Sequence, residues 1–162
     1  MQLDAEPLLS VLTEQIGKLP GETVLVGIHT GGVWVAERLH AKLGVKLPLG
    51  KLAVTLHRDD FSRIGLHPTK KATEMPFDVD GRHILLVDDV LNSGRTLRAA
   101  LNELFDFGRP ASVKLAVLVD RGRRELPFAA DYVGATMALD AGQELVLSND
   151  NHHLRFSIQE KS

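Results

Sequence analysis

Residues 83–97 read His-Ile-Leu-Leu-Val-Asp-Asp-Val-Leu-Asn-Ser-Gly-Arg-Thr-Leu, and the rest of the chain can be interpreted around them. The aliphatic run 84–87 is typical of a parallel strand that is buried on both faces. Asp88 and Asp89 follow at its carboxyl end, which is the edge where open α/β sheets bind ligands. Residues 92–96 then lead into a helical pattern, so their backbone N–H groups should point at an anion.

Two adjacent carboxylates beside an anion-binding loop suit a ligand that carries hydroxyl groups, a phosphate and a magnesium ion. On an extended strand the side chains of Asp88 and Asp89 point to opposite faces, but at a strand end the chain can turn and bring them together. The simpler interpretation is a strand that ends in two aspartates and a generic turn. The complete pattern of aliphatic run, aspartates, Gly-x-Thr loop and helix favours the ligand site.

The composition predicts a single domain. The chain has 162 residues, 44% of them hydrophobic, which is enough for a substantial core. The absence of cysteine excludes disulfides and thiolate metal sites and favours a reducing compartment. A net charge of −2 does not indicate a general nucleic-acid binder. The sequence does not begin with the basic and then apolar residues of a signal peptide, and it has no apolar run long enough to span a membrane. We therefore expect a cytoplasmic protein without membrane contact.

Strands alternate with helices along the chain, which predicts an α/β fold with a mainly parallel sheet. Helices are expected over 5–19 with Asp4 as N-cap, over 33–43 and over 97–107. Buried strands are expected at 23–28, 52–56, 84–87 and 113–119, and shorter strands at 130–134, 144–147 and 154–158, with a hairpin around 149–151. The segment 61–80 lacks periodicity, as functional loops often do.

Residues 87–96, Val-Asp-Asp-Val-Leu-Asn-Ser-Gly-Arg-Thr, resemble the phosphoribosyl-diphosphate (PRPP) signature of type I phosphoribosyltransferases. The flanking segments are similar to the PyrR family, whose members are uracil phosphoribosyltransferases and, in some cases, attenuators that bind pyrimidine-operon mRNA. These segments are 25–32, 55–60, 107–110, 115–127 and 130–134. The resemblance implies one type I phosphoribosyltransferase domain over 1–162, with a central parallel sheet flanked by helices, a small hood from the terminal segments and a mobile active-site loop at about 61–80.

The resemblance also implies a role for each segment of the site. Asp88 and Asp89 would hold the ribose hydroxyls, directly or through water on an Mg2+ ion that PRPP chelates and no side chain ligates directly. The 5′-phosphate would be bound by Asn92, Ser93, Gly94, Arg95 and Thr96. The leaving diphosphate would face His29, Thr30, Gly31 and Gly32. The mobile loop, with Arg58 as a catalytic residue at its base and Lys70 and Lys71 within it, would close over the diphosphate and exclude water.

The nucleobase would be bound by residues outside these segments and by the residue at position 92. In the related hypoxanthine-guanine enzymes an acidic residue stands where this chain has Asn92, and a lysine stands where it has Asp120. Neither is present here, which favours a pyrimidine base. The resemblance implies that Tyr132 and Val133 cover the ring and offer backbone groups to its edge, with Arg121 as support, while an ordinary core position is the alternative for Tyr132.

Two departures from the family pattern bear on function. Family members commonly carry arginine where this chain has Gly31, and its loss would weaken diphosphate binding unless backbone N–H groups and the loop lysines compensate. RNA-binding members have an arginine-rich first helix, whereas residues 5–19 contain neither arginine nor histidine, a poor surface for RNA. Arg121, Arg123 and Arg124 form the remaining basic cluster that could touch RNA, and the preferred interpretation is a solvated turn with one substrate-supporting arginine.

The sequence therefore predicts a magnesium-dependent uracil phosphoribosyltransferase of the PyrR type, which forms UMP and diphosphate from uracil and PRPP by displacement at C1′. The alternatives are an mRNA-binding attenuation regulator with little enzymatic activity and a purine phosphoribosyltransferase. We also expect a homo-oligomer, a dimer or larger, because small domains often bury an extra apolar face in this way.

Overall fold

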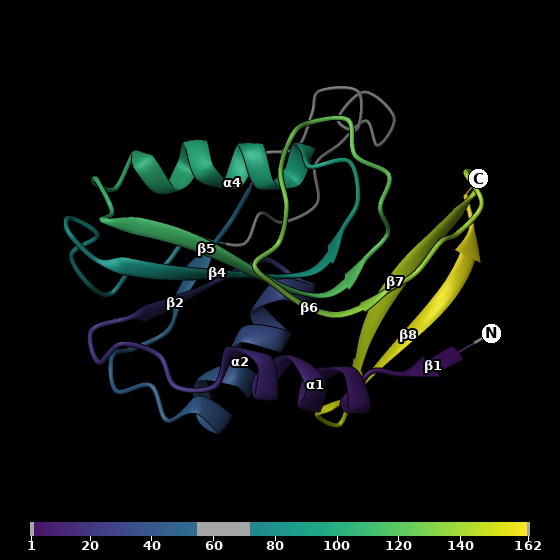
Figure 1. Ribbon diagram of the computed structural model, residues 1–162, viewed down its shortest axis with the longest axis horizontal. Helices are drawn as coiled ribbons and strands as arrows, with labels where there is room; N and C mark the ends of the chain where they lie inside the picture. Colours follow the sequence, from purple (N-terminus) through teal and green to yellow (C-terminus); the bar gives the residue numbers. More distant parts are fainter. Residues whose placement is uncertain (1, 55–71, 162) are drawn as a thin grey trace.

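The computed structural model describes residues 2–54 and 72–161, which form two sheets and their covering helices. The central sheet has five strands in the order β3-β2-β4-β5-β6, all parallel to their neighbours. Its strands are β2 (Val24–Ile28), β3 (Gly50–Leu52), β4 (His83–Leu91), β5 (Ser112–Asp120) and β6 (Tyr132–Thr136). Helices α1 (Glu6–Ile16) and α2 (Gly31–Leu43) lie on one face and α4 (Arg95–Phe105) on the other (Figure 1). The predicted α/β fold is confirmed.

The second sheet joins the two ends of the chain. Its strands β1 (Gln2–Asp4), β8 (His153–Glu160) and β7 (Gln143–Asp150) pair antiparallel in that order, beyond the carboxyl ends of the central strands (Figure 1). Asn151 and His152 form the turn of the predicted hairpin, with φ of 55° and 68°. Positive φ at both residues gives a two-residue turn whose twist matches that of the strands.

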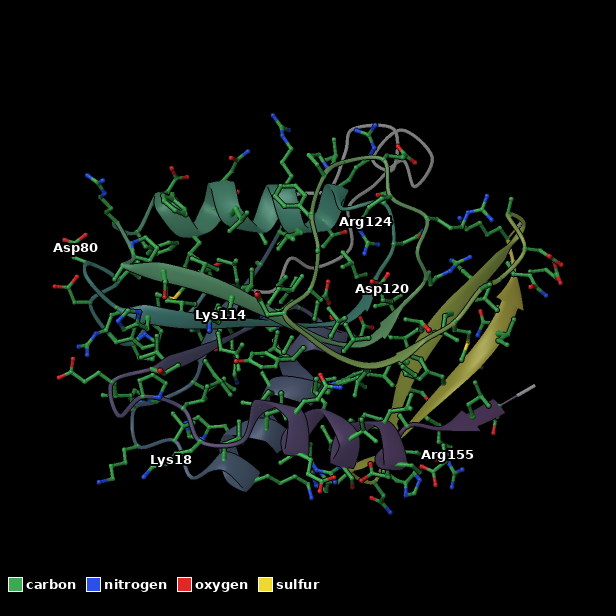
Figure 2. The ribbon with its side chains drawn as sticks, in the orientation of Figure 1. Lys18, Asp80, Lys114, Asp120, Arg124 and Arg155 are labelled. Atoms are coloured by element: carbon green, nitrogen blue, oxygen red, sulfur yellow. The ribbon has the colours of Figure 1, made fainter. Side chains whose placement is uncertain are left out.

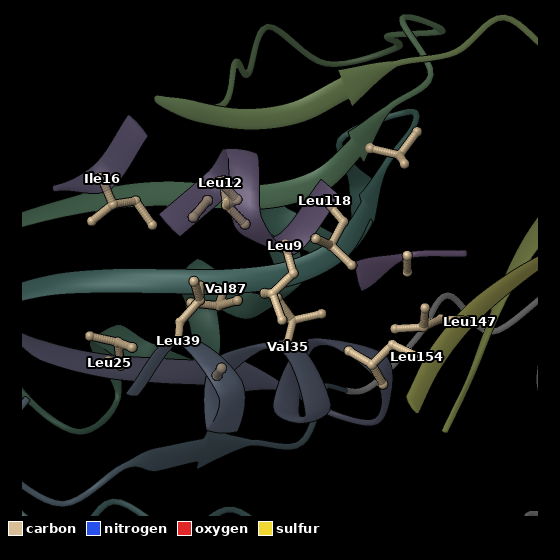
Figure 3. Packing of buried hydrophobic residues seen from close by; sticks show 14 of the residues in the cluster. Leu9, Leu12, Ile16, Leu25, Val35, Leu39, Val87, Leu118, Leu147 and Leu154 are labelled. Carbon is tan, nitrogen blue, oxygen red and sulfur yellow. The ribbon is translucent and has the colours of Figure 1, made fainter. Parts of the chain in front are cut away.

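Apolar side chains fill both faces of the central sheet because alternate residues of each strand point to opposite faces. Towards α1 and α2, Leu9, Leu39 and Val87 belong to a buried cluster that also takes in Leu147 and Leu154 of the terminal sheet (Figure 3). This shared cluster packs the terminal sheet onto the helices.

Within the described ranges, no helix combines the length and apolar character needed to cross a lipid bilayer.

Gly27 allows α2 to lie directly on β2. A Cβ atom at this position would be 2.8 Å from the Val33 Cα and 2.9 Å from the Gly32 carbonyl oxygen. Such distances leave no room for a side chain between the strand and the helix. The close approach fixes the first turn of α2 at the carboxyl end of the sheet.

A partly buried charged cluster ties the terminal sheet to both helices. Glu6 accepts hydrogen bonds from Arg38 Nη1 at 2.9 Å and from the Leu154 N–H at 3.0 Å. Arg38 also donates to the His152 carbonyl at 2.8 Å. The hydrogen bond from Arg38 lowers the pKa of Glu6, so this carboxylate is ionised when it holds α1, α2 and β8 together.

Several boundaries differ from those expected. The first helix ends at Ile16 rather than 19, because Gly17 closes it with φ of 59°, and its N-cap is Ala5 instead of Asp4, which lies in β1. The strand expected at 52–56 begins at Gly50 and ends at Leu52, and residues 55–56 lie outside the described residues. The strand expected at 130–134 is found at Tyr132–Thr136. For these two strands the register with the neighbouring strand, rather than local composition, sets the boundary.

The described part of the loop expected at about 61–80, residues 72–80, contains no helix and no named strand. Lys51 and Glu74 exchange two backbone hydrogen bonds, of 2.8 and 2.7 Å, and the Val79 side chain is buried. Residues 72–80 are therefore packed against the body of the domain. Residues 61–71 of the predicted loop lie outside the described residues.

Candidate functional site

Three of the expected site segments, which are the turn 29–32, the acidic pair 88–89 and the loop 92–96, meet at the carboxyl edge of the central sheet. The turn 29–32 follows β2, and β2 is paired with β4, which carries Asp88 and Asp89. A Cβ atom on Gly32 would lie 2.6 Å from the Val87 carbonyl oxygen and 2.9 Å from the Asp88 Cα. The peptide bond between His29 and Thr30 in the same turn is cis. The glycine turn and the aspartates are thus in direct backbone contact.

β4 continues through the acidic pair instead of ending before it. Asp88, Val90 and Leu91 remain paired with Val117, Val119 and Asp120 of β5. The expectation that the strand covers only 84–87 is therefore corrected, because pairing with β5 extends it to Leu91.

The two carboxylates nevertheless converge on the first turn of α2. Asp88 Oδ1 accepts the Asp89 N–H at 2.8 Å, and Asp89 Oδ1 accepts the Val90 N–H at 2.8 Å. A Cβ on Gly32 would be 3.1 Å from Asp88 Oδ1, and one on Gly31 would overlap Asp89 Oδ2. The glycines leave space for both carboxylates beside the positive end of the helix dipole.

Burial, the negative charge of Asp89 and a hydrogen bond with its side chain together raise the pKa of Asp88 well above the ordinary aspartate value. The ionised pair is therefore unfavourable unless a positive charge lies next to it. A proton or a metal ion can supply that charge. Within 2–54 and 72–161, no group of three or more histidine, aspartate or glutamate side chains is placed to hold a metal by itself.

The loop between β4 and α4 lines an open pocket of about 140 Å³. Gly94, at φ of 96°, is the N-cap of α4 and has no side chain that could cap the helix. The Ser93 Oγ accepts the N–H of Arg95 at 3.2 Å, so the next N–H groups of the first turn are the ones available to an anion. The pocket is lined by Ile28, Asp88, Val90, Leu91, Asn92, Ser93, Gly94, Thr96, Leu97, Leu115 and Val117.

Four of the five residues expected around the 5′-phosphate line this pocket, and Arg95 does not. The Arg95 Nε donates to Glu125 Oε1 at 2.8 Å on the surface, while its backbone N–H donates to Ser93 Oγ at 3.2 Å. The Asn92 Oδ1 is buried and accepts no hydrogen bond within the described part of the chain. Arg95 therefore shapes the loop from outside, whereas Asn92 holds an unused acceptor inside it.

The basic cluster that follows β5 is not a solvated turn. Arg124 forms a two-pronged ion pair with Asp120, with N–O distances of 2.9 and 2.7 Å, and Figure 2 shows the two side chains side by side near the start of α4. Hydrogen bonding from Arg124 lowers the pKa of Asp120. Arg121 is buried, at 7% exposure, and its Nε has no partner among the described residues. Only Arg123, which donates to the Leu139 carbonyl at 3.2 Å, is exposed.

The backbone groups of Val133, which were expected at the edge of the base, are bound by α1. Val133 pairs with Val117, which is level with Asp88. The Gln15 side chain donates to the Val133 carbonyl at 2.7 Å and accepts the Val133 N–H at 3.1 Å. Tyr132 packs against the hydrophobic cluster under α1 and α2. The expectation of free backbone groups is corrected for Val133, because Gln15 occupies both of its groups, while contact of Tyr132 and Val133 with the base stays a prediction.

Three of the expected site residues, Arg58, Lys70 and Lys71, lie outside the described residues. The residues missed by sequence reasoning are Gln15, Gly27 and the ion-pair partner Arg124. Opposite charges four positions apart at Asp120 and Arg124 were a signal, but without a helix that spacing does not predict contact. For Gln15, whose partner is 118 residues away, the sequence holds no comparable signal.

Comparisons with known proteins agree with this arrangement. The model of the phosphoribosyl transferase domain family matches residues 8–144. A Ralstonia nicotianae protein named bifunctional protein PyrR is 51% identical over 154 residues, 92% of this chain and 88% of that protein. A Pseudomonas paraeruginosa protein of the same name is 58% identical over 122 residues, 75% of this chain and 72% of that protein.

Two solved structures are similar in fold. A hypoxanthine phosphoribosyltransferase from Staphylococcus aureus aligns with a TM-score of 0.64 and 20% identity, over 85% of this chain and 77% of that chain. A purine phosphoribosyltransferase from Pyrococcus horikoshii aligns with a TM-score of 0.61 and 23% identity, over 82% of each chain. At these identities the likeness concerns the fold and carries no information about the base.

Proposed function

This chain belongs to the phosphoribosyl transferase domain family and, within it, to the PyrR family, and on that premise we propose that it forms UMP and diphosphate from uracil and PRPP. The observation that carries the proposal is the position of the acidic pair. Asp88 and Asp89 lie between the first turn of α2 and the pocket at the start of α4. Two helix N-termini, each suited to an anion, thus flank two carboxylates suited to hydroxyl groups.

The two ends of PRPP match these two helix termini. The 5′-phosphate would be held at the α4 pocket by N–H groups of the loop and by the hydroxyls of Ser93 and Thr96. The diphosphate would face His29 to Gly32 at the start of α2, so that C1′ of the ribose lies between the two. The protein then contributes mainly by positioning the reactants and stabilising the developing charge.

Magnesium fits the same arrangement. A diphosphate beside Asp88 and Asp89 would bring several negative charges together at one helix terminus, and the raised pKa of Asp88 already reflects repulsion between two of them. An Mg2+ ion chelated by PRPP would supply the missing positive charge. Asp88 and Asp89 are the residues that would orient the ion's water and the ribose hydroxyls.

Asn92 and Arg121 are the residues that we assign to base recognition. The Arg121 N–H donates to the Leu91 carbonyl at 2.9 Å, which places Arg121 next to the strand end that leads into Asn92. Each side chain has a buried polar atom without a partner within the described residues, an acceptor on Asn92 and a donor on Arg121. The edge of uracil offers both a donor and acceptors, whereas an acidic residue at 92 would suit a purine.

Incubation with PRPP, magnesium and either uracil or hypoxanthine tests the proposed reaction. We expect UMP from uracil, with kcat/KM for uracil exceeding that for hypoxanthine by about 10²-fold or more. The wrong base would leave buried polar groups of the site without hydrogen-bond partners, and such a site rejects that ligand strongly. Chromatographic detection of UMP and IMP measures both reactions. Faster turnover of hypoxanthine would replace this proposal with a purine phosphoribosyltransferase.

Regulation through pyrimidine-operon mRNA is a second candidate function, because the curated relatives are named bifunctional. Of the three clustered arginines, Arg121 is buried and Arg124 is ion-paired, so only Arg123 is exposed for a phosphate contact. The affinity for leader RNA should therefore depend only weakly on salt concentration. Arg123→Ala should reduce the magnitude of the slope of log binding constant against log salt concentration by about one. A filter-binding series at several salt concentrations measures the slope, and a steep slope unchanged by Arg123→Ala would place the RNA surface elsewhere.

The expected homo-oligomer stays a prediction. Phe105 and Phe107, at 53% and 47% exposure, are large apolar side chains that association would cover.

A further inference from the structure

The segment that follows β5 packs against the outer side of the loop at 92–94. The Ser93 carbonyl accepts hydrogen bonds from the backbone N–H groups of Glu125 at 2.9 Å and Leu126 at 3.0 Å. The Asn92 carbonyl accepts a hydrogen bond from Arg124 Nη1 at 2.9 Å. Two consecutive carbonyl groups of the loop are thereby turned towards this segment.

The direction of these carbonyls determines the direction of the next N–H groups. A trans peptide unit is planar, and its C=O and N–H bonds point in opposite directions. With the carbonyls of Asn92 and Ser93 held outward, the N–H groups of Ser93 and Gly94 are directed away from the segment. Ser93 and Gly94 both line the pocket at the start of α4.

Arg124 joins three parts of this arrangement through one guanidinium group. Besides the bond to Asn92, it pairs with Asp120 at the end of β5 and donates from Nε to the Phe128 carbonyl at 2.7 Å. The side chains of Arg124 and Asp120 are 24% and 16% exposed, so water competes weakly for these bonds. The planar fork of arginine can serve all three partners at fixed angles, whereas the single nitrogen of lysine cannot.

We propose that Arg124 is a positioning residue that orients the N–H group of Ser93 towards the 5′-phosphate of the substrate, while the N–H groups of Glu125 and Leu126 orient that of Gly94 through the Ser93 carbonyl. Arg124 does not touch the phosphate, and acts through the Asn92 carbonyl. The inference rests on the proposed function, because it takes residues 92–96 as the 5′-phosphate loop.

Arg124→Lys tests the proposal when the affinities for UMP and for uridine are compared. The two ligands differ only in the 5′-phosphate, so a general loosening of the fold would weaken both alike. We expect the dissociation constant of UMP, measured by calorimetry, to rise about 10-fold or more and that of uridine to stay within about twofold. An unchanged ratio of the two constants would overturn the proposal.

Two further variants separate the carbonyl contact from the other effects of the change. Arg123→Lys makes the same replacement one residue earlier, at a side chain bonded only to the Leu139 carbonyl among the described residues, and should leave the ratio unchanged. Asp120→Asn removes the ion pair but leaves Arg124 able to reach Asn92, and should change the ratio less than Arg124→Lys does. An equal effect of Asp120→Asn would overturn the assignment to the carbonyl contact.

The wild-type protein distinguishes this inference from the proposed function. If wild type binds UMP no more tightly than uridine, the assignment of the 5′-phosphate loop fails. If wild type prefers UMP and Arg124→Lys retains the full preference, only the role of Arg124 fails. Arg124→Gln provides the same comparison if circular dichroism shows that Arg124→Lys does not fold.

Discussion

Replacement of Asp88 by asparagine is expected to slow UMP formation by about 10²- to 10³-fold while raising the melting temperature of the protein. The loss of activity follows from the proposed role of the carboxylate, because an amide cannot match its charge beside the ribose hydroxyls and magnesium. The gain in stability follows from the raised pKa, which means that the folded protein disfavours the ionised form of Asp88. Asparagine keeps an oxygen that can accept the Asp89 N–H.

The pH dependence gives this prediction a definite sign. The folded protein binds the Asp88 proton more tightly than the unfolded chain does, so ionisation of Asp88 lowers the free energy of unfolding. This loss begins as the pH rises past the ordinary value of 3.8 and is complete above the raised folded-state pKa. The difference in melting temperature between Asp88→Asn and wild type should therefore grow with pH across that window and then level off.

Thermal denaturation at several pH values, together with kcat/KM for PRPP, measures both effects. Asp106→Asn is the matched control, because Asp106 is exposed at the end of α4, and it should alter neither quantity. An Asp88→Asn protein that is less stable than wild type at neutral pH would contradict the account of the acidic pair.

Gly32→Ala is expected to lower the free energy of unfolding by about 1–3 kcal/mol and to reduce kcat/KM by about 10²-fold. The added Cβ would lie 2.6 Å from the Val87 carbonyl oxygen and 2.9 Å from the Asp88 Cα. These are backbone atoms of β4, so the clash cannot be relieved by rotating a side chain. Either α2 or the strand must shift, and both carry parts of the proposed site.

Gly21→Ala is the control for this substitution, because a Cβ at Gly21 would have no atom within 4 Å. Its melting temperature should match that of wild type or rise slightly, since alanine restricts the unfolded chain. Chemical denaturation and initial rates with PRPP measure the two variants. Wild-type rates for Gly32→Ala would show that α2 and β4 do not need their close approach for catalysis.

Several features of the fold could be predicted because their causes are local. The run 84–87 is apolar without alternation and is buried, as a central parallel strand requires. Adjacent parallel strands end at the same edge of a sheet. This rule predicts that the glycine turn after β2 lies beside the acidic pair and the pocket-lining loop after β4, as the structure shows.

Other predictions failed because the same local pattern fits two tertiary settings. For the arginines after β5, a solvated turn with one substrate-supporting arginine was preferred to an RNA-contacting surface. The nearby carbonyls of Asn92 and Phe128 instead make Arg124 a partly buried hydrogen-bond donor. Tyr132 and Val133 were expected to cover the base, with an ordinary core position as the alternative for Tyr132. β6 is an edge strand of partly exposed residues, and Gln15 of α1 binds the backbone groups of Val133.

The sequence by itself determined the fold class, the family and the segments that form the candidate site, because burial patterns and turn residues act over a few neighbouring positions. Only the tertiary structure decided how far β4 extends, where the carboxylates of Asp88 and Asp89 point, and which of the three arginines after β5 is exposed. Those outcomes depend on atoms from distant segments that approach within hydrogen-bonding distance, and local composition does not encode such distances.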